Sequence, residues 1–203
     1  MIRILIILLI LLWLPVCLQG QVQFNNLYDF EGEGEAGNNI LPLKGGGYLI
    51  SEFAPSYKTG KRVEQAAYFI IDSLGNRLLK KSYAFDSSLV REGKMISLND
   101  GSFADIRTLQ DLDSNNNLIN RVVLIKFDEN LDTLWTRTFE DTVSQKLNAR
   151  TIIQAQDSGI IILAIKQNGS INTNTIILSL DKEGNEILRR EITTPRRGEL
   201  YSI

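Results

Sequence analysis

The stretch at residues 122–139, VVLIKFDENLDTLWTRTF, decides the fold of this chain. An apolar run ends at Asp128, a short polar turn follows, and a second run begins at Leu134 and ends at Phe139. Two β-prone segments that flank a polar turn of two to five residues are typical of a β-hairpin. We therefore expect this stretch to form an antiparallel pair of strands.

The same pattern occurs twice more, at residues 67–83 (AYFIIDSLGNRLLKKSY) and 175–192 (TIILSLDKEGNEILRREI). Its turns begin at Asp72, Asp128 and Asp181, which are spaced 56 and 53 residues apart. Asp at the mouth of a turn usually accepts hydrogen bonds from nearby backbone N–H groups, and we interpret these aspartates in that way. A hairpin that recurs along the chain indicates a repeat architecture.

A second hairpin precedes each of these, with a glycine at the end of its turn. The glycines are Gly47, Gly101 and Gly159, and a tight reversal with a positive φ angle would require them. Each unit then reads strand, turn, strand, loop, strand, turn, strand. We expect the first strands to begin at Ile40, Met95 and Thr151, and the loops to span residues 54–63, 111–120 and 166–174.

Four antiparallel strands repeated at roughly 40–50 residues or a little more are typical of β-propeller blades. A β-sandwich is the competing all-β fold, but it needs no internal repeat. We therefore predict an all-β partial propeller of about three four-stranded blades, at residues 40–83, 95–139 and 151–192 within a repeat region 40–203. Residues 199–203 resemble the start of a fourth blade, so we expect an N-terminal fragment of a larger propeller.

The first 20 residues have the layout of a secretory signal peptide: a positive charge at Arg3, an apolar run of eleven residues and a break at Pro15. Eleven residues rise only about 16 Å as a helix, too short for a bilayer core of about 30 Å. We expect cleavage after Gly20 and no transmembrane helix in the mature chain, followed by a strand at 21–30 within an N-terminal segment 21–39. Lipidation of Cys17 is the alternative, although Val16 stands where lipoprotein signals carry a small residue.

Composition excludes several function classes. The chain of 203 residues has a net charge of −2, so no basic surface indicates nucleic-acid binding. It has no histidine, and its single cysteine lies in the signal segment, so Ser-His-Asp and Cys-His sites are not available to the mature chain. The sequence gives no catalytic or cofactor-binding residues, and among enzymes it leaves open those that use carboxylates alone, such as glycosidases.

The best metal-ligand candidates lie in one polar loop, with oxygen side chains at alternate positions as in a calcium loop. They are Asp111, Asp113, Asn115 and Asn117. The glycine and the glutamate that complete a calcium loop are replaced by Asn116 and Val122. We therefore favour a solvated loop between strands and expect no bound metal.

The repeat resembles a known family. The turns DGSF and DSGI, at residues 100–103 and 157–160, are followed by hairpins like LIKFDENLDTLW. They look like the repeats of secreted Bacteroidota proteins, which carry propeller-like repeats and often end in a type IX secretion sorting domain. The resemblance covers residues 40 to 203 and implies export and an extracellular role. We expect no sorting domain within residues 40–203, where the repeats lie.

The hairpin IKFDENLDTLW is also distantly similar to those of pyrroloquinoline-quinone propellers, in which an aspartate, a turn and a tryptophan recur. Trp135 keeps that tryptophan, whereas Leu79 and Leu188 replace it in the other repeats. No cofactor ligands carry over. We expect Trp135 to be largely buried, within its own blade or against the next one.

Together these observations predict an exported module with a binding or structural role at the cell surface, in the periplasm or outside the cell. Its partner would be a protein or a glycan. The alternative is a secreted glycan-active enzyme that uses two carboxylates about 5–10 Å apart in one pocket.

Overall fold

The computed structural model describes residues 36–58, 61–85, 89–142, 146–168 and 172–193, which form twelve strands and no helix. The predicted signal peptide, the strand at 21–30 and the fourth-blade start at 199–203 lie outside these residues. Three antiparallel sheets, called blades here, each consist of four consecutive strands in sequence order. The fold is therefore all-β and has the architecture of a partial propeller, as predicted.

Blade 1 contains β1 (Ala36–Pro42), β2 (Tyr48–Lys58), β3 (Lys61–Ile71) and β4 (Arg77–Ala84). Blade 2 contains β5 (Leu89–Ser97), β6 (Phe103–Leu112), β7 (Leu118–Phe127) and β8 (Thr133–Phe139). Blade 3 contains β9 (Leu147–Gln154), β10 (Ile160–Asn168), β11 (Asn172–Leu180) and β12 (Glu186–Thr193).

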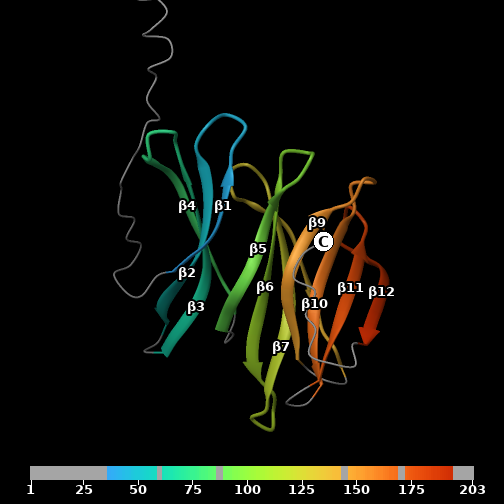
Figure 1. The fold of residues 1–203 in the computed structure, drawn as a ribbon. Helices are drawn as coiled ribbons and strands as arrows, with labels where there is room; N and C mark the ends of the chain where they lie inside the picture. Colours follow the sequence, from blue (N-terminus) through green and yellow to red (C-terminus); the bar gives the residue numbers. More distant parts are fainter. Residues whose placement is uncertain (1–35, 59–60, 86–88, 143–145, 169–171, 194–203) are drawn as a thin grey trace, which may run out of the picture.

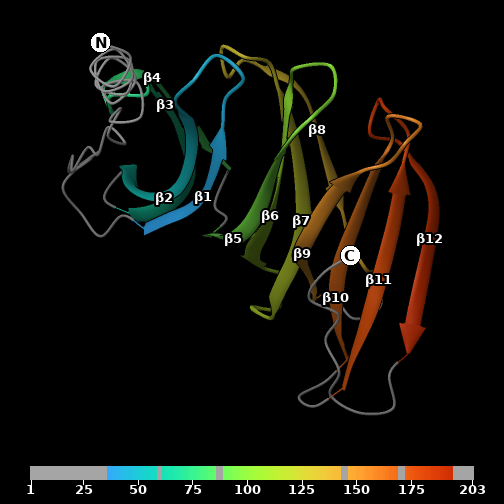
Figure 2. The same cartoon turned by 45° about the horizontal axis from the view of Figure 1, so that its top comes forward.

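The blades stand side by side as a fan, with blade 2 in the middle (Figures 1 and 2). The first strands of successive blades are in contact, β1 with β5 and β5 with β9, so they lie on the inner side of the fan. The last strand of each blade is then the outer one. Equivalent strands of the three blades therefore lie at the same distance from the inner side of the fan.

The core fills the two junctions between blades. Apolar side chains of blades 1 and 2, among them Leu49, Tyr68 and Phe127, form one cluster, and those of blades 2 and 3, among them Leu124 and Ile162, form the other. Because blade 2 is covered on both faces, the first seven residues of β6 are all buried. Strand β12 is exposed along its whole length. Each fully buried leucine or isoleucine in these junctions contributes about 1.5–3 kcal/mol.

The strands are longer than the sequence predicted. The expected loops at 54–63, 111–120 and 166–174 are largely strand, since β2 runs to Lys58 and β6 and β7 still pair at Leu112 and Leu118. The first strands also begin early, at Ala36, Leu89 and Leu147. Polar side chains suggested loops here, but an antiparallel ladder satisfies its own backbone groups, and buried polar residues such as Asn120 and Asn174 have side-chain hydrogen-bond partners.

The prediction for Gly159 was also wrong. The residue with positive φ in that turn is Ser158 (φ 67°), whereas Gly101 (φ 86°) and Gly47 (φ 83°) have it as predicted. Gly159 is required for space instead, because a Cβ there would lie 2.5 Å from the carbonyl oxygen of Leu180.

Candidate functional site

The turns that join the first two and the last two strands of each blade gather at one end of the fan, called the turn end here. In the last turn of blade 3, Asp181 Oδ1 accepts hydrogen bonds from the backbone N–H of Glu183 (3.0 Å) and Asn185 (2.8 Å). Its Oδ2 accepts from the Asn185 side chain (2.8 Å). These hydrogen bonds, first that of the Asn185 amide, lower the pKa of Asp181. Asp72 has the same contacts, so the turn-capping interpretation is confirmed.

The metal-ligand candidates form the same kind of turn at the opposite end of blade 2. Asp113 Oδ1 accepts hydrogen bonds from the backbone N–H of Asn115 and Asn117 (2.8 Å each), and Asn116 takes the positive φ angle of 62°. The Asn117 side chain donates to Asp113 Oδ2 at 3.0 Å. Asp111 instead forms an ion pair with Arg121. Among the described residues, no group of three or more acidic or thiol side chains is placed to hold a metal ion.

Two repeat positions make the contact between successive blades at the turn end. The first is seven residues after the turn aspartate and the second is three residues after the aspartate of the next blade. At the junction of blades 2 and 3 these are Trp135 and Gly184: a Cβ on Gly184 would lie 2.7 Å from Trp135 Cη2. Trp135 is partly buried rather than largely buried, and its contact with the adjacent blade is as predicted.

The junction of blades 1 and 2 uses a different pair at these positions. Leu131 is fully buried and has a positive φ of 60°, and Leu79 packs against the same cluster. A left-handed conformation costs a leucine about 1–2 kcal/mol, which burial of its side chain offsets. Trp135 of blade 2 thus faces a glycine of blade 3, whereas the smaller Leu79 of blade 1 faces a leucine of blade 2.

A cation two residues further along the outer strand adds a polar contact at each junction. Lys81 forms an ion pair with Asp132 of blade 2. Arg137 donates to the carbonyl oxygen of Glu183 in blade 3 (3.0 Å) and lies over the Trp135 ring, 5.3 Å from its centroid. The turn of each following blade is therefore held by both packing and charge.

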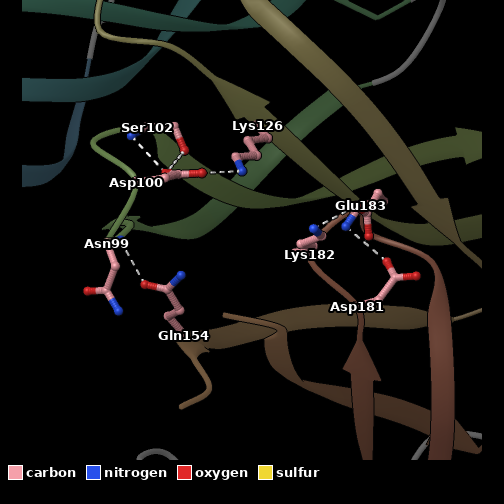
Figure 3. A network of polar contacts seen from close by, with 8 residues as sticks. All are labelled: Asn99, Asp100, Ser102, Lys126, Gln154, Asp181, Lys182 and Glu183. Atoms are coloured by element: carbon pink, nitrogen blue, oxygen red, sulfur yellow. Dashed lines mark hydrogen bonds and ion pairs between the residues drawn. The ribbon is translucent and has the colours of Figure 1, made fainter. Parts of the chain in front are cut away.

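A cavity of about 390 Å³ opens beside Trp135 at the second junction, and we call it the junction pocket. It is lined by polar and aromatic side chains from blades 2 and 3: Asp100, Lys126, Trp135, Gln154, Ser158, Lys182 and Glu183. Figure 3 shows most of this network. Because Lys126 and Trp135 are opposite each other on β7 and β8, their side chains share the face of blade 2 toward blade 3.

Asp100 fixes one wall of the pocket. Its Oδ2 lies 2.7 Å from the Lys126 ammonium, and its Oδ1 accepts hydrogen bonds from the backbone N–H (3.0 Å) and the hydroxyl of Ser102 (Figure 3). Desolvation opposes ionisation of Asp100, but these contacts outweigh it and lower its pKa to about 2. On the other wall, Gln154 Oε1 accepts from the backbone N–H of Asn99 (2.8 Å). Hydrogen bonds and an ion pair thus hold Asp100, Lys126 and Gln154 in the walls of the pocket.

The first junction has a cavity of about 460 Å³ at the corresponding place, but its lining differs. Cross-strand pairing makes Ile70 the counterpart of Lys126, and Ser97 the counterpart of Gln154. Leu79 stands where blade 2 has Trp135. The fold therefore accepts apolar or small residues at the positions that make the junction pocket polar.

Charged side chains also cluster at the opposite end of the second junction. Lys166 lies 3.1 Å from carboxylate oxygens of both Asp141 and Glu191, and hydrogen bonding to Asp141 is the main cause of its raised pKa. Arg121 contacts Asp111 and Glu140 beside a cavity of about 180 Å³. Since the acids and cations here contact one another, this cluster joins the ends of blades 2 and 3.

One ion pair is fully buried between blades 1 and 2. Arg107 Nε donates to Asp105 Oδ2 (2.6 Å), which also accepts from the Tyr68 hydroxyl (2.5 Å). Burial raises the pKa of both Asp105 and Tyr68. Asp105 is the carboxyl group with a raised pKa among the residues that the structure describes, and its side chain has no exposure to solvent.

Compared with known proteins, the chain matches no protein-family model and no curated protein. Function must therefore be inferred from the site itself. Within the residues that the structure describes, no helix has the length and hydropathy needed to cross a membrane.

Apart from Trp135, the residues of the junction pocket were not singled out from the sequence. Lys126 lies within an apolar run, and Asp100 belongs to a turn motif, so neither stands out alone. The available signal was the comparison of repeats, because Lys126 replaces Ile70 at an equivalent position.

Proposed function

We propose that this chain is an exported, propeller-type module that binds a protein or a glycan at the cell surface. The signal-like residues 1–20 support export. The three-bladed all-β architecture supports a module that presents turns and junctions to a partner. Such positions on a rigid scaffold are where binding residues usually lie.

The observation that carries the binding role is the difference between the two junction cavities. Lys126 stands where the first junction has the apolar Ile70, and the longer Gln154 stands where it has Ser97. A lysine with only 9% of its surface exposed loses solvation that an isoleucine would not lose. Apolar packing does not account for a lysine at this position; its ion pair with Asp100 holds it in place, and a ligand that uses its remaining donors gives a reason for it.

The protonation states of the exposed acids favour binding over acid catalysis. Asp100 has its pKa lowered to about 2, and Asp181 is also shifted downward, so both are ionised at neutral pH. A carboxyl that acts as a general acid needs a pKa raised toward neutrality. Ionised carboxylates held in place by turns serve instead as fixed hydrogen-bond acceptors.

The proposal is tested by locating the protein and measuring its retention on cells. The tagged full chain should be cut by protease added to intact cells, and purified protein should bind the outer surface of cells that lack the gene. A chain that stays in the cytosol, or one that hydrolyses glycans, would contradict the proposal.

A further inference from the structure

We infer that the junction pocket is a subsite for an uncharged sugar unit of a glycan. This inference rests on the proposed binding function and narrows its ligand. The pocket volume of about 390 Å³ lies near the small end of the range for ligand sites, about 300–1,000 Å³.

The charges of the lining side chains balance. Lys126 and Lys182 are cations, and Asp100 and Glu183 are anions. Each cation contacts one of these anions: Lys126 lies 2.7 Å from Asp100, and Lys182 lies 3.6 Å from Glu183. A strongly anionic polymer would meet two carboxylates here and a cationic one two ammonium groups, so the electrostatics favour a neutral ligand.

The pocket combines hydrogen-bond donors and acceptors. Among described residues the Lys126 ammonium contacts one acceptor, Asp100, and two of its three N–H donors are left for a ligand. Gln154 uses its oxygen to accept from Asn99, which leaves its NH₂ group as a donor. The Glu183 carboxylate, in the last turn of blade 3, supplies acceptors (Figure 3). Sugar hydroxyls both donate and accept, so this mixture suits a polyol better than an apolar ligand.

Trp135 supplies the apolar surface that a sugar ring also requires. Its indole edge rests on Gly184, the Arg137 guanidinium lies 5.3 Å from the ring centroid, and the ring is only partly buried. A partly exposed indole offers a rigid apolar surface to the C–H groups of a sugar, beside the polar groups that bind its hydroxyls. The equivalent positions in blades 1 and 3 hold Leu79 and Leu188, so the blade fold does not demand an aromatic residue there.

The variants that test this inference are taken from the chain's own repeats. Lys126→Ile and Gln154→Ser install the residues of the first junction, which that junction accommodates. Glu129→Gln is the matched control, because it changes a residue that lines the first cavity. Circular dichroism of each full-length variant checks that the fold is intact.

Calorimetric titration with neutral β-linked disaccharides, and with their uronic-acid counterparts, should show saturable binding of a neutral sugar. Lys126→Ile should weaken that binding at least about 10-fold, since it removes a charge-assisted hydrogen bond, and Glu129→Gln should not change it. Binding of only the uronic acids, no saccharide binding, or equal binding by Lys126→Ile would overturn the inference. Retention on cells is measured separately, so loss of the sugar subsite and loss of the binding function give different results.

Discussion

The contact between Trp135 and Gly184 makes a quantitative prediction about how the blades interlock. Replacing Gly184 by alanine adds a Cβ at φ +82°, 2.7 Å from Trp135 Cη2 and 2.8 Å from Cζ3. Ordinary contacts lie at 3.4–4 Å, so the ring must move. The backbone strain costs about 1–2 kcal/mol and overpacking adds about 1–3 kcal/mol, which gives roughly 2–5 kcal/mol in the free energy of unfolding.

Gly101→Ala is the matched control for this prediction. Gly101 has nearly the same φ, +86°, but a Cβ there would have nothing within 4 Å. Gly101→Ala should therefore lower the free energy of unfolding only by the cost of the backbone strain, about 1–2 kcal/mol. Urea unfolding followed by far-UV circular dichroism measures both variants and gives the m-values that show whether the unfolded states are comparable.

The double variant Trp135→Leu, Gly184→Ala separates packing from strain. A smaller side chain at position 135 should accommodate the new Cβ, as Leu79 accommodates Leu131 at the first junction. The cost of Gly184→Ala should then fall toward that of Gly101→Ala, with Arg137 Cγ, 3.1 Å from the new Cβ, as the remaining close contact. If Gly184→Ala costs no more than Gly101→Ala in the natural background, or if Trp135→Leu gives no relief, the docking argument is wrong.

Three further predictions concern charges and processing. Asp100→Asn should lower the free energy of unfolding at pH 7 by only about 0.5–1 kcal/mol, since half of the carboxylate is exposed. The pKa of Asp100 in the folded state is below its value in the unfolded state. Urea titrations should therefore show the difference between the two proteins disappearing as pH falls from about 4 to about 2. Arg107→Met leaves Asp105 buried without its cation and should cost about 3–5 kcal/mol in urea unfolding, whereas Asp105→Leu and Tyr68→Phe combined with Arg107→Met should restore most of it, because no buried polar partner is then left behind. Mass spectrometry of the exported protein should find Gln21 at the N-terminus; a lipid-modified Cys17 would contradict this.

Much of the fold could be predicted because turns and apolar positions recur. Asp72, Asp128 and Asp181 located one hairpin of each blade, since an aspartate that caps a five-residue turn leaves a local signature. The length of β6 and β7 could not be predicted in the same way. Asp113 begins the same kind of turn, but the polar residues around it suggested a loop, and strand pairing is a non-local property.

The candidate site was harder to predict than the fold. The pocket requires Asp100 from a turn, Lys126 from β7 and Gln154 from β9 to meet, and this depends on register and on how two blades pack. The buried pair did have a local signal. Asp105 and Arg107 are two residues apart in an apolar strand and therefore share one face.

The most direct test of the central claim uses Trp135 as a reporter at the junction pocket. The chain has two tryptophans, and Trp13 lies in the signal segment that we expect to be removed, so Trp135 is the sole source of indole fluorescence in the mature protein. Addition of a neutral disaccharide should shift its emission saturably and protect it from acrylamide quenching, and Lys126→Ile should weaken both effects. An emission spectrum and a quenching constant that do not change over the whole titration would contradict the assignment of this pocket as the binding site.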